Sequence, residues 1–206
     1  TAKAEEILIA KGYTKTGDYW TKDGNELGLE IEVHEAFSEL EKIADVYVEQ
    51  LQRFGINGVK VKLTGDTWGD NFNFGRFEAQ SGWQTCGSIM EPYSSLLTLA
   101  GDPAPIDARP ELGENAYRWY NERFTEIVTE MGTLFWDDPR LMELTEEALA
   151  IYYDELPVIP TALAKKLVPF NTTYWTNWPT NDNYYQVPCI WWTALIEILT
   201  EIEPVE

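Results

Sequence analysis

Residues 27–63 read LGLEIEVHEAFSELEKIADVYVEQLQRFGINGVKVKL, and this stretch decides the fold class. Apolar residues occupy every second position over most of 27–33, which predicts a strand. They then recur at steps of three or four over 37–54, which predicts an amphipathic helix that stops at Gly55. Alternation returns over 59–63. A strand, a helix and a second strand in this order form a βαβ unit with parallel strands, so we predict an α/β fold.

The sequence on either side of this unit is less regular. Before it, we predict a short helix over 4–11 and a hairpin turn at Asp23-Gly24, between residues 19–20 and the strand over 27–33. After it, residues 64–113 are rich in Gly, Pro, Asn and aromatic side chains, so we expect irregular loops there, where functional residues often lie. Two exceptions are a short apolar piece at 78–83 and a helix near 92–100.

The C-terminal half predicts further helices. One is capped by Asn121 and stopped by Gly132, and another begins at 137–139, where a proline follows two acidic residues. We also expect a strand over 163–170 and a helix over the apolar run 190–202. The chain contains no internal repeat and no low-complexity tract.

Composition excludes several classes of protein. The 206 residues are 44% hydrophobic and 14% aromatic, which suits a folded core and argues against disorder. The net charge of −20 repels phosphate backbones and anionic lipid surfaces, so nucleic acid and membrane-surface partners are disfavoured. No apolar run reaches the roughly 20 residues needed to cross a bilayer. If the protein is exported, its signal peptide lies upstream of Thr1.

Metal and cofactor chemistry is not predicted. The two cysteines, Cys86 and Cys189, are far apart and lack a CxxC pattern or a neighbouring histidine, and whether they are free stays open. The lone histidine, His34, stands at a strand end, which favours a surface or hydrogen-bonded residue over a base or a metal ligand. We therefore predict no metal site and no cofactor.

Several short motifs follow one another in a fixed order between Ala4 and Pro160. They read AKGY, KDG, QLQRFGI, VKVKL, SGW, EP, NAYRWYNERFTEI and DDPRLMELTEEALAIYYDELPVIP. In this order they resemble the C-terminal lobe of the family 5 solute-binding proteins, the peptide- and oligosaccharide-binding components of ABC importers. The tryptophan pair at 191–192 resembles the family's return to its first lobe.

This resemblance implies a periplasmic-binding-protein-like lobe of type II character, with βαβ units on a mixed sheet. Residues 1–167 would form the C-terminal ligand-binding lobe, and 168–206 would cross the hinge and pack on an N-terminal lobe outside this chain. The implied protein is no enzyme: it closes on a small-molecule ligand and delivers it to an ABC permease. The implied location is the periplasm or the cell surface.

The residues after Trp83 bear on the ligand. Peptide-binding members of the family place an aspartate a few residues after the Gly-Trp pair, where it binds the α-amino group of the peptide. Here Gly82-Trp83 is followed by Gln84 and the sequence TCGS, so this anchor is missing. The departure favours an oligosaccharide, and an oligopeptide stays as the alternative.

Sugar sites combine aromatic platforms with amide or guanidinium groups that bond hydroxyls. Trp83 is the favoured platform because it follows Gly82 at the end of a short predicted strand, although tryptophans are also common in cores. The aromatic segment 174–178 fits a sugar site equally well, yet in the family it lies near the first lobe. The candidate ligand-binding residues are Trp83, Trp119, Arg118, Gln84, Asn115, Tyr93, Trp68, Trp175 and Trp178.

Two other functions remain open. A glycoside hydrolase would need two acids flanking a bond, and Glu78 with Asp102 is one candidate pair. The sequence contains no GxSxG, P-loop or HExxH motif, so we predict no catalytic residue. The second alternative is a lectin-like module that works without a permease.

Overall fold

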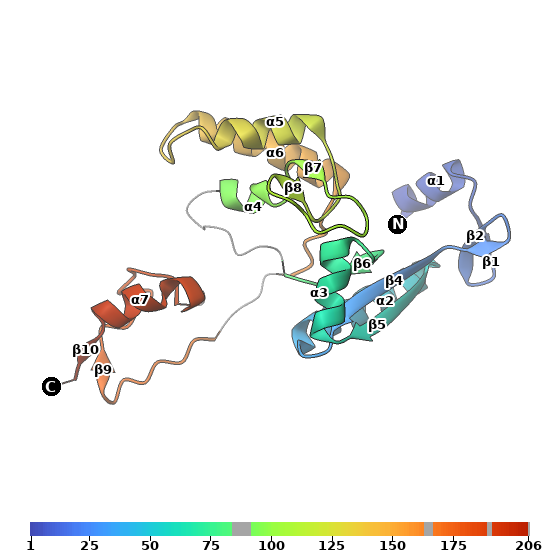
Figure 1. The fold of residues 1–206 in the computed structure, drawn as a ribbon. Helices are drawn as coiled ribbons and strands as arrows, with labels where there is room; N and C mark the ends of the chain where they lie inside the picture. The colour runs from blue at the N-terminus through green and yellow to red at the C-terminus, as the bar shows by residue number, and fades with distance from the viewer. Residues whose placement is uncertain (84–91, 163–166, 189–190, 206) are drawn as a thin grey trace. The chain divides into compact units, whose positions relative to one another are not determined.

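The computed structural model describes residues 1–83, 92–162, 167–188 and 191–205 (Figure 1). These residues form two compact units, Thr1–Ile159 and Pro160–Glu206. The described helices are α1 Ala2–Ala10, α2 Ser38–Phe54, α3 Gly65–Phe74, α4 Tyr93–Leu97, α5 Glu122–Met131, α6 Arg140–Glu155 and α7 Trp191–Glu201. The described strands are β1 Thr14–Thr16, β2 Tyr19–Lys22, β3 Asn25–Glu26, β4 Gly28–His34, β5 Asn57–Leu63, β6 Ala79–Gln80, β7 Asp102–Pro103, β8 Glu114–Asn115, β9 Trp175–Thr176 and β10 Glu203–Pro204.

The main sheet of unit 1 has the strand order β5-β4-β6. Its strands are all parallel, and β4 pairs with β5 over its whole length, from Gly28 opposite Asn57 to His34 opposite Leu63. Helix α2 connects these two strands. The βαβ unit predicted from residues 27–63 is therefore confirmed, and so is the α/β class.

Helix α2 is held to the sheet by its apolar stripe. Ile31 and Val33 on β4 are buried together with Ala44 on α2, and Leu51 packs against the same group. Side chains alternate between the faces of a strand, so Glu32, between Ile31 and Val33, points the other way. That opposite face is covered by α3, which lies in front of the sheet in Figure 1.

The predicted hairpin turn has a different second partner from the one expected. Asp23 and Gly24 both have positive φ, 54° and 80°, as a two-residue hairpin turn requires, but the turn joins β2 to the short strand β3. Strands β1, β2 and β3 form a separate antiparallel sheet. Trp20 fixes this sheet to the βαβ unit, because its indole N–H donates to the carbonyl of Phe54 at 3.1 Å.

Helix α3 lies where the sequence predicted irregular loops, so that prediction was wrong for residues 65–74. The segment GDTWGDNFNF has two glycines, two aspartates and two asparagines, all poor helix formers. Its ends compensate: the hydroxyl of Thr64 accepts a hydrogen bond from the N–H of Thr67, and Gly75 closes the helix at φ 66°. Contact with β4 adds tertiary support.

Helices α4, α5 and α6 form the second core of unit 1. Phe124, Ile127 and Leu144 are at its centre with no exposed surface. The predicted start of α5 is confirmed, since the side-chain oxygen of Asn121 accepts from the N–H of Phe124 at 2.9 Å. Helix α6 begins one residue later than predicted, with Pro139 as its N-cap.

The cap of α5 gives a stability prediction. Asn121→Ala removes the acceptor for an N–H at the helix start, so we expect the free energy of unfolding to fall by about 0.5–2 kcal/mol in denaturant titrations. Asn121→Ser keeps an acceptor and should recover most of this loss. Because the Asn121 amide also donates to Glu155, equal losses in both variants would assign the effect to that contact instead.

Unit 2 is small. It contains the antiparallel pair β9–β10 and helix α7, which confirms the helix expected over 190–202. Of the strand predicted over 163–170, residues 167–170 are described and are not in a strand, while 163–166 lie outside the described residues. The assignment of 168–206 to another lobe stays a prediction. Among the described residues, no helix has the length and hydropathy to cross a membrane.

Candidate ligand-binding site

The three parallel strands end at one edge of the sheet, which we call the carboxyl edge. Strands β4, β5 and β6 end at His34, Leu63 and Gln80. In open α/β sheets, ligands bind in the crevice outside the carboxyl ends of the strands, at the point where the strand order reverses. Here β5 and β6 flank β4 on opposite sides, so the reversal falls at β4.

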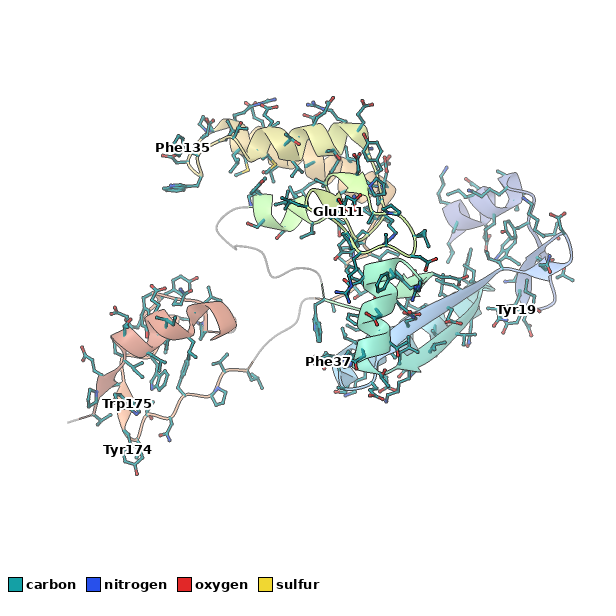
Figure 2. The ribbon with its side chains drawn as sticks, in the orientation of Figure 1. Tyr19, Phe37, Glu111, Phe135, Tyr174 and Trp175 are labelled. Atoms are coloured by element: carbon teal, nitrogen blue, oxygen red, sulfur yellow. The ribbon has the colours of Figure 1, made fainter. Side chains whose placement is uncertain are left out.

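Four rings gather at the carboxyl edge, and we call them the edge cluster: His34, Phe37, Trp68 and Trp83. The ring of Phe37 lies 4.3 Å from that of His34 and 4.4 Å from that of Trp83, measured between centroids. The indole of Trp68 meets His34 edge-on at 5.7 Å. Trp83 is 44% exposed. Figure 2 shows Phe37 at this edge of unit 1.

Two members of the edge cluster were not among the predicted site residues. The sequence favoured a surface or hydrogen-bonded role for His34, and it assigned Phe37 to the apolar stripe of the following helix. Both residues stand at or just after the predicted end of a parallel strand, which is the signal that would have found them. The structure thus brings together Trp68 and Trp83 from the predicted set and adds His34 and Phe37.

A buried carboxylate lies behind the edge cluster. Glu32 on β4 is only 4% exposed, and its two oxygens accept from the side-chain amides of Asn71 on α3 at 2.5 Å and Gln80 on β6 at 2.7 Å. The Gln80 amide also donates to the backbone carbonyl of Trp68. Buried carboxylates need such donors. The Glu32 network therefore links β4, α3 and β6 directly behind the candidate site.

Arg118 has mostly structural contacts. It has a positive φ of 57°, and its terminal nitrogens donate to five backbone carbonyls. The five acceptors are Phe72, Asn73, Pro105, Ala108 and Ala116. Gly75 leaves room for the guanidinium, since a Cβ at that position would lie 2.2 Å from its Nε. Because these contacts are structural, we leave Arg118 out of the candidate site.

Three other predicted residues lie in the helical part of unit 1. The Asn115 amide is buried and donates to the carbonyls of Gly101 and Trp119. The indole of Trp119 packs edge-on against Phe124 and donates to Glu155, and Tyr93 packs against the same helical core. Their described contacts hold the fold together, and ligand contact by them stays a prediction. Gln84, like Cys86 and Cys189, lies outside the described residues.

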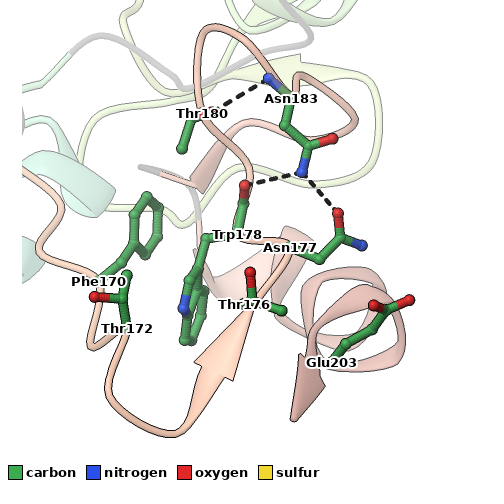
Figure 3. Close-up of a pocket in the computed structure, with 8 residues that line it drawn as sticks. All are labelled: Phe170, Thr172, Thr176, Asn177, Trp178, Thr180, Asn183 and Glu203. Atoms are coloured by element: carbon green, nitrogen blue, oxygen red, sulfur yellow. Dashed lines mark hydrogen bonds between the residues drawn. The ribbon is translucent and has the colours of Figure 1, made fainter. Parts of the chain in front are cut away.

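Trp175 and Trp178 belong to unit 2, where the structure has a shallow pocket of about 460 Å³ (Figure 3). Trp178 stacks on Phe170 at 5.0 Å, and its indole N–H donates to the carbonyls of Asn171 and Trp175. The pocket is lined by Phe170, Thr172, Thr176, Asn177, Trp178, Thr180, Asn183 and Glu203. Burial raises the pKa of the phenol of Tyr185, which donates to the Asn177 carbonyl beside this pocket.

Charged groups of unit 1 pair with one another at its surface. Arg109 contacts Asp70 at 3.4 Å. Arg76 contacts Asp107 at 2.6 Å, and both guanidinium groups lie over the ring of Phe74. Within the described part of the chain, no group of three or more acidic, histidine or cysteine side chains is placed to hold a metal ion.

Comparison with known proteins finds similarity in structure. No family model matches the chain, and no curated protein matches it. A mannohexaose-bound periplasmic oligopeptide-binding protein of an ABC transporter from Thermotoga maritima is 22% identical with a TM-score of 0.79, and the match covers 98% of this chain and 39% of that one.

Two further solved structures match most of the chain. The oligopeptide-binding protein AppA from Bacillus subtilis, in complex with a nonapeptide, is 18% identical with a TM-score of 0.59. NikZ from Campylobacter jejuni, in complex with Ni(L-His), is 16% identical with a TM-score of 0.63. Each match covers 76% of this chain and 30% of the other.

The similar structure from Thermotoga maritima is a periplasmic binding protein of an ABC transporter, the class that the sequence resemblance implied. This chain spans about two fifths or less of the length of each of the three similar proteins. The fold implied by the resemblance is therefore confirmed, and the chain has the fold of part of a periplasmic binding protein.

Proposed function

We propose that this chain belongs to an extracytoplasmic substrate-binding protein of an ABC importer and forms one face of its ligand cleft. The fold supports this proposal, and so does an aromatic cluster at the carboxyl edge, where such sheets bind ligands. The complete protein has an N-terminal lobe that closes over this face and that residues 168–206 pack against. It is exported by a signal peptide to the periplasm or the cell surface and passes its ligand to an ABC permease.

The ligand in this proposal is an oligosaccharide, bound without catalysis. The observation that carries this choice is Trp83, whose large flat ring is 44% exposed and held in place from one side by Phe37. Such a ring stacks on the C–H face of a sugar, while the cleft supplies polar groups for its hydroxyls. The missing aspartate after Trp83 and the mannohexaose in the Thermotoga maritima protein support the same choice.

An oligopeptide is the second candidate. The similar proteins from Thermotoga maritima and Bacillus subtilis are named as oligopeptide-binding, and the second of them holds a nonapeptide. The fold alone is thus compatible with both ligand classes. The choice between an oligosaccharide and an oligopeptide depends on the side chains that follow Trp83. Direct binding measurements separate the two candidates.

Tryptophan fluorescence of the full-length protein tests the choice. We expect saturable changes on titration with manno-, cello- or xylo-oligosaccharides, because an occupied platform at Trp83 changes its solvent exposure. Di- and tripeptides serve as the comparison series and should give no response. Tight peptide binding without any response to the sugars would replace the oligosaccharide by an oligopeptide.

Two further observations test the class of protein. An oligosaccharide incubated with the full-length protein should be recovered uncleaved, and released products would favour the glycoside-hydrolase alternative. The gene should stand beside genes for a permease and an ATPase. A gene without such neighbours would favour the lectin-like alternative.

A further inference from the structure

His34 is the only histidine of the chain, and it is the last residue of β4. Its Nδ1 accepts a hydrogen bond from the backbone N–H of Ala36 at 3.0 Å. Nδ1 thus serves as an acceptor, which a phenyl ring at this position could not do. Together with the N–H of Phe37, which donates to the His34 carbonyl at 3.3 Å, this bond holds the turn by which the chain leaves the sheet.

The same imidazole is at the centre of the edge cluster. Phe37 packs on it at 4.3 Å and Trp68 meets it at 5.7 Å, while Trp83 contacts Phe37 on the outer side. Close packing at Nε2 depends on Gly65, because a Cβ there would lie 2.6 Å from that nitrogen. The position of Trp83 therefore depends on Phe37, and the position of Phe37 depends on His34.

We propose that His34 is a positioning residue for Trp83, and that its Nδ1 acceptor helps to hold the 34–37 turn in the arrangement that presents the Trp83 ring to a ligand. The proposal rests on the function proposed above, since it concerns the same site. A side chain without this acceptor loses the bond from the N–H of Ala36, and we expect Trp83 to change its position as a result.

The charged groups around His34 are mainly acidic. Glu32 lies two residues earlier on the same face of β4, but both of its oxygens are held by amides. Glu35 follows in the turn, and Asp66 is in the first turn of α3. On β5, the neighbour of His34 is Leu63, and the ammonium of Lys62 is engaged by Glu41.

Two variants separate the roles of the ring nitrogen and the ring. His34→Asn keeps an acceptor near the place of Nδ1 and does not ionise. His34→Phe keeps an aromatic ring and has no acceptor. In the full-length protein, we expect both variants to bind the oligosaccharide more weakly than the wild type, the Phe variant by about tenfold and the Asn variant by less, because Asn keeps the acceptor but loses the ring.

The decisive measurement needs no ligand. The difference in emission between the wild type and Trp83→Phe isolates the Trp83 signal. We expect the same difference, measured on the His34→Phe background, to change in wavelength or intensity, and on the His34→Asn background to stay closer to that of the wild type. An unchanged Trp83 signal on the His34→Phe background would overturn the proposal.

Oligosaccharide titrations of the two His34 variants give a second test. Weaker binding by His34→Phe than by His34→Asn supports the positioning role, and equal binding by both contradicts it. If the wild type binds neither sugars nor peptides, the proposed function fails, and the ligand-free emission still decides whether His34 positions Trp83.

Discussion

Arg118→Ala is expected to lower the free energy of unfolding of unit 1 by about 3–5 kcal/mol, because it removes one cation that serves five backbone carbonyls. The acceptors in α3 and in the 105–108 loop lose their charged donor together. Arg118→Lys keeps the charge but has a compact ammonium with three donors, so it should recover little of the loss.

Urea titration of the full-length protein, followed by circular dichroism and by fluorescence, measures this effect. Arg109→Ala is the matched control, since Arg109 is an exposed arginine from the same loop region with one ion pair to Asp70. Exposed pairs of this kind contribute little, so the control should leave stability nearly unchanged. If the free energy of unfolding of Arg118→Ala is no lower than that of Arg109→Ala, the five carbonyls must find other donors when Arg118 is absent.

Trp83→Ala is expected to weaken oligosaccharide binding by about 1–3 kcal/mol, a loss of about 5- to 150-fold in affinity. The loss comes from removal of the apolar surface that stacks on a sugar ring. Trp83→Phe retains a smaller platform and should give an intermediate affinity. Since 44% of the Trp83 side chain is exposed, neither variant should greatly change the free energy of unfolding.

Trp136→Ala is the control for this experiment. Trp136 is 78% exposed in the connection between α5 and α6, far along the chain from the carboxyl edge. Isothermal titration calorimetry should give the wild-type affinity for this variant. If Trp83→Ala binds as tightly as Trp136→Ala, the platform is not at Trp83 and the candidate site must be sought elsewhere.

The sequence was sufficient for the parts of the fold with strong periodicity. Residues 27–63 carry a period of two, then one of 3.6, then two again, and Ile31, Val33 and Leu51 from this pattern lie in the core that α2 forms with the sheet. Helix α3 was missed because its residues are poor helix formers, and its stability comes from two caps and from contact with β4. Tertiary contacts are not visible in a local pattern.

The candidate site was predictable in part for the same reason. Trp83 was found because it follows a short strand that ends at the carboxyl edge. Arg118 was among the candidate ligand-binding residues, yet it bonds carbonyls in α3 that are 45 and 46 residues away along the chain. The contribution of His34 and Phe37 depends on ring contacts that only the folded chain brings about.

Glu32 has a consequence for the thermodynamics of binding. The carboxylate takes one amide from α3 and one from β6, so three elements behind Trp83 are immobilised before any ligand arrives. Most of the conformational entropy of β4, α3 and β6 is therefore lost during folding, and little more is lost when a ligand binds. Single substitutions among the exposed side chains of the site can then change affinity without any change in the residues that hold these three elements together.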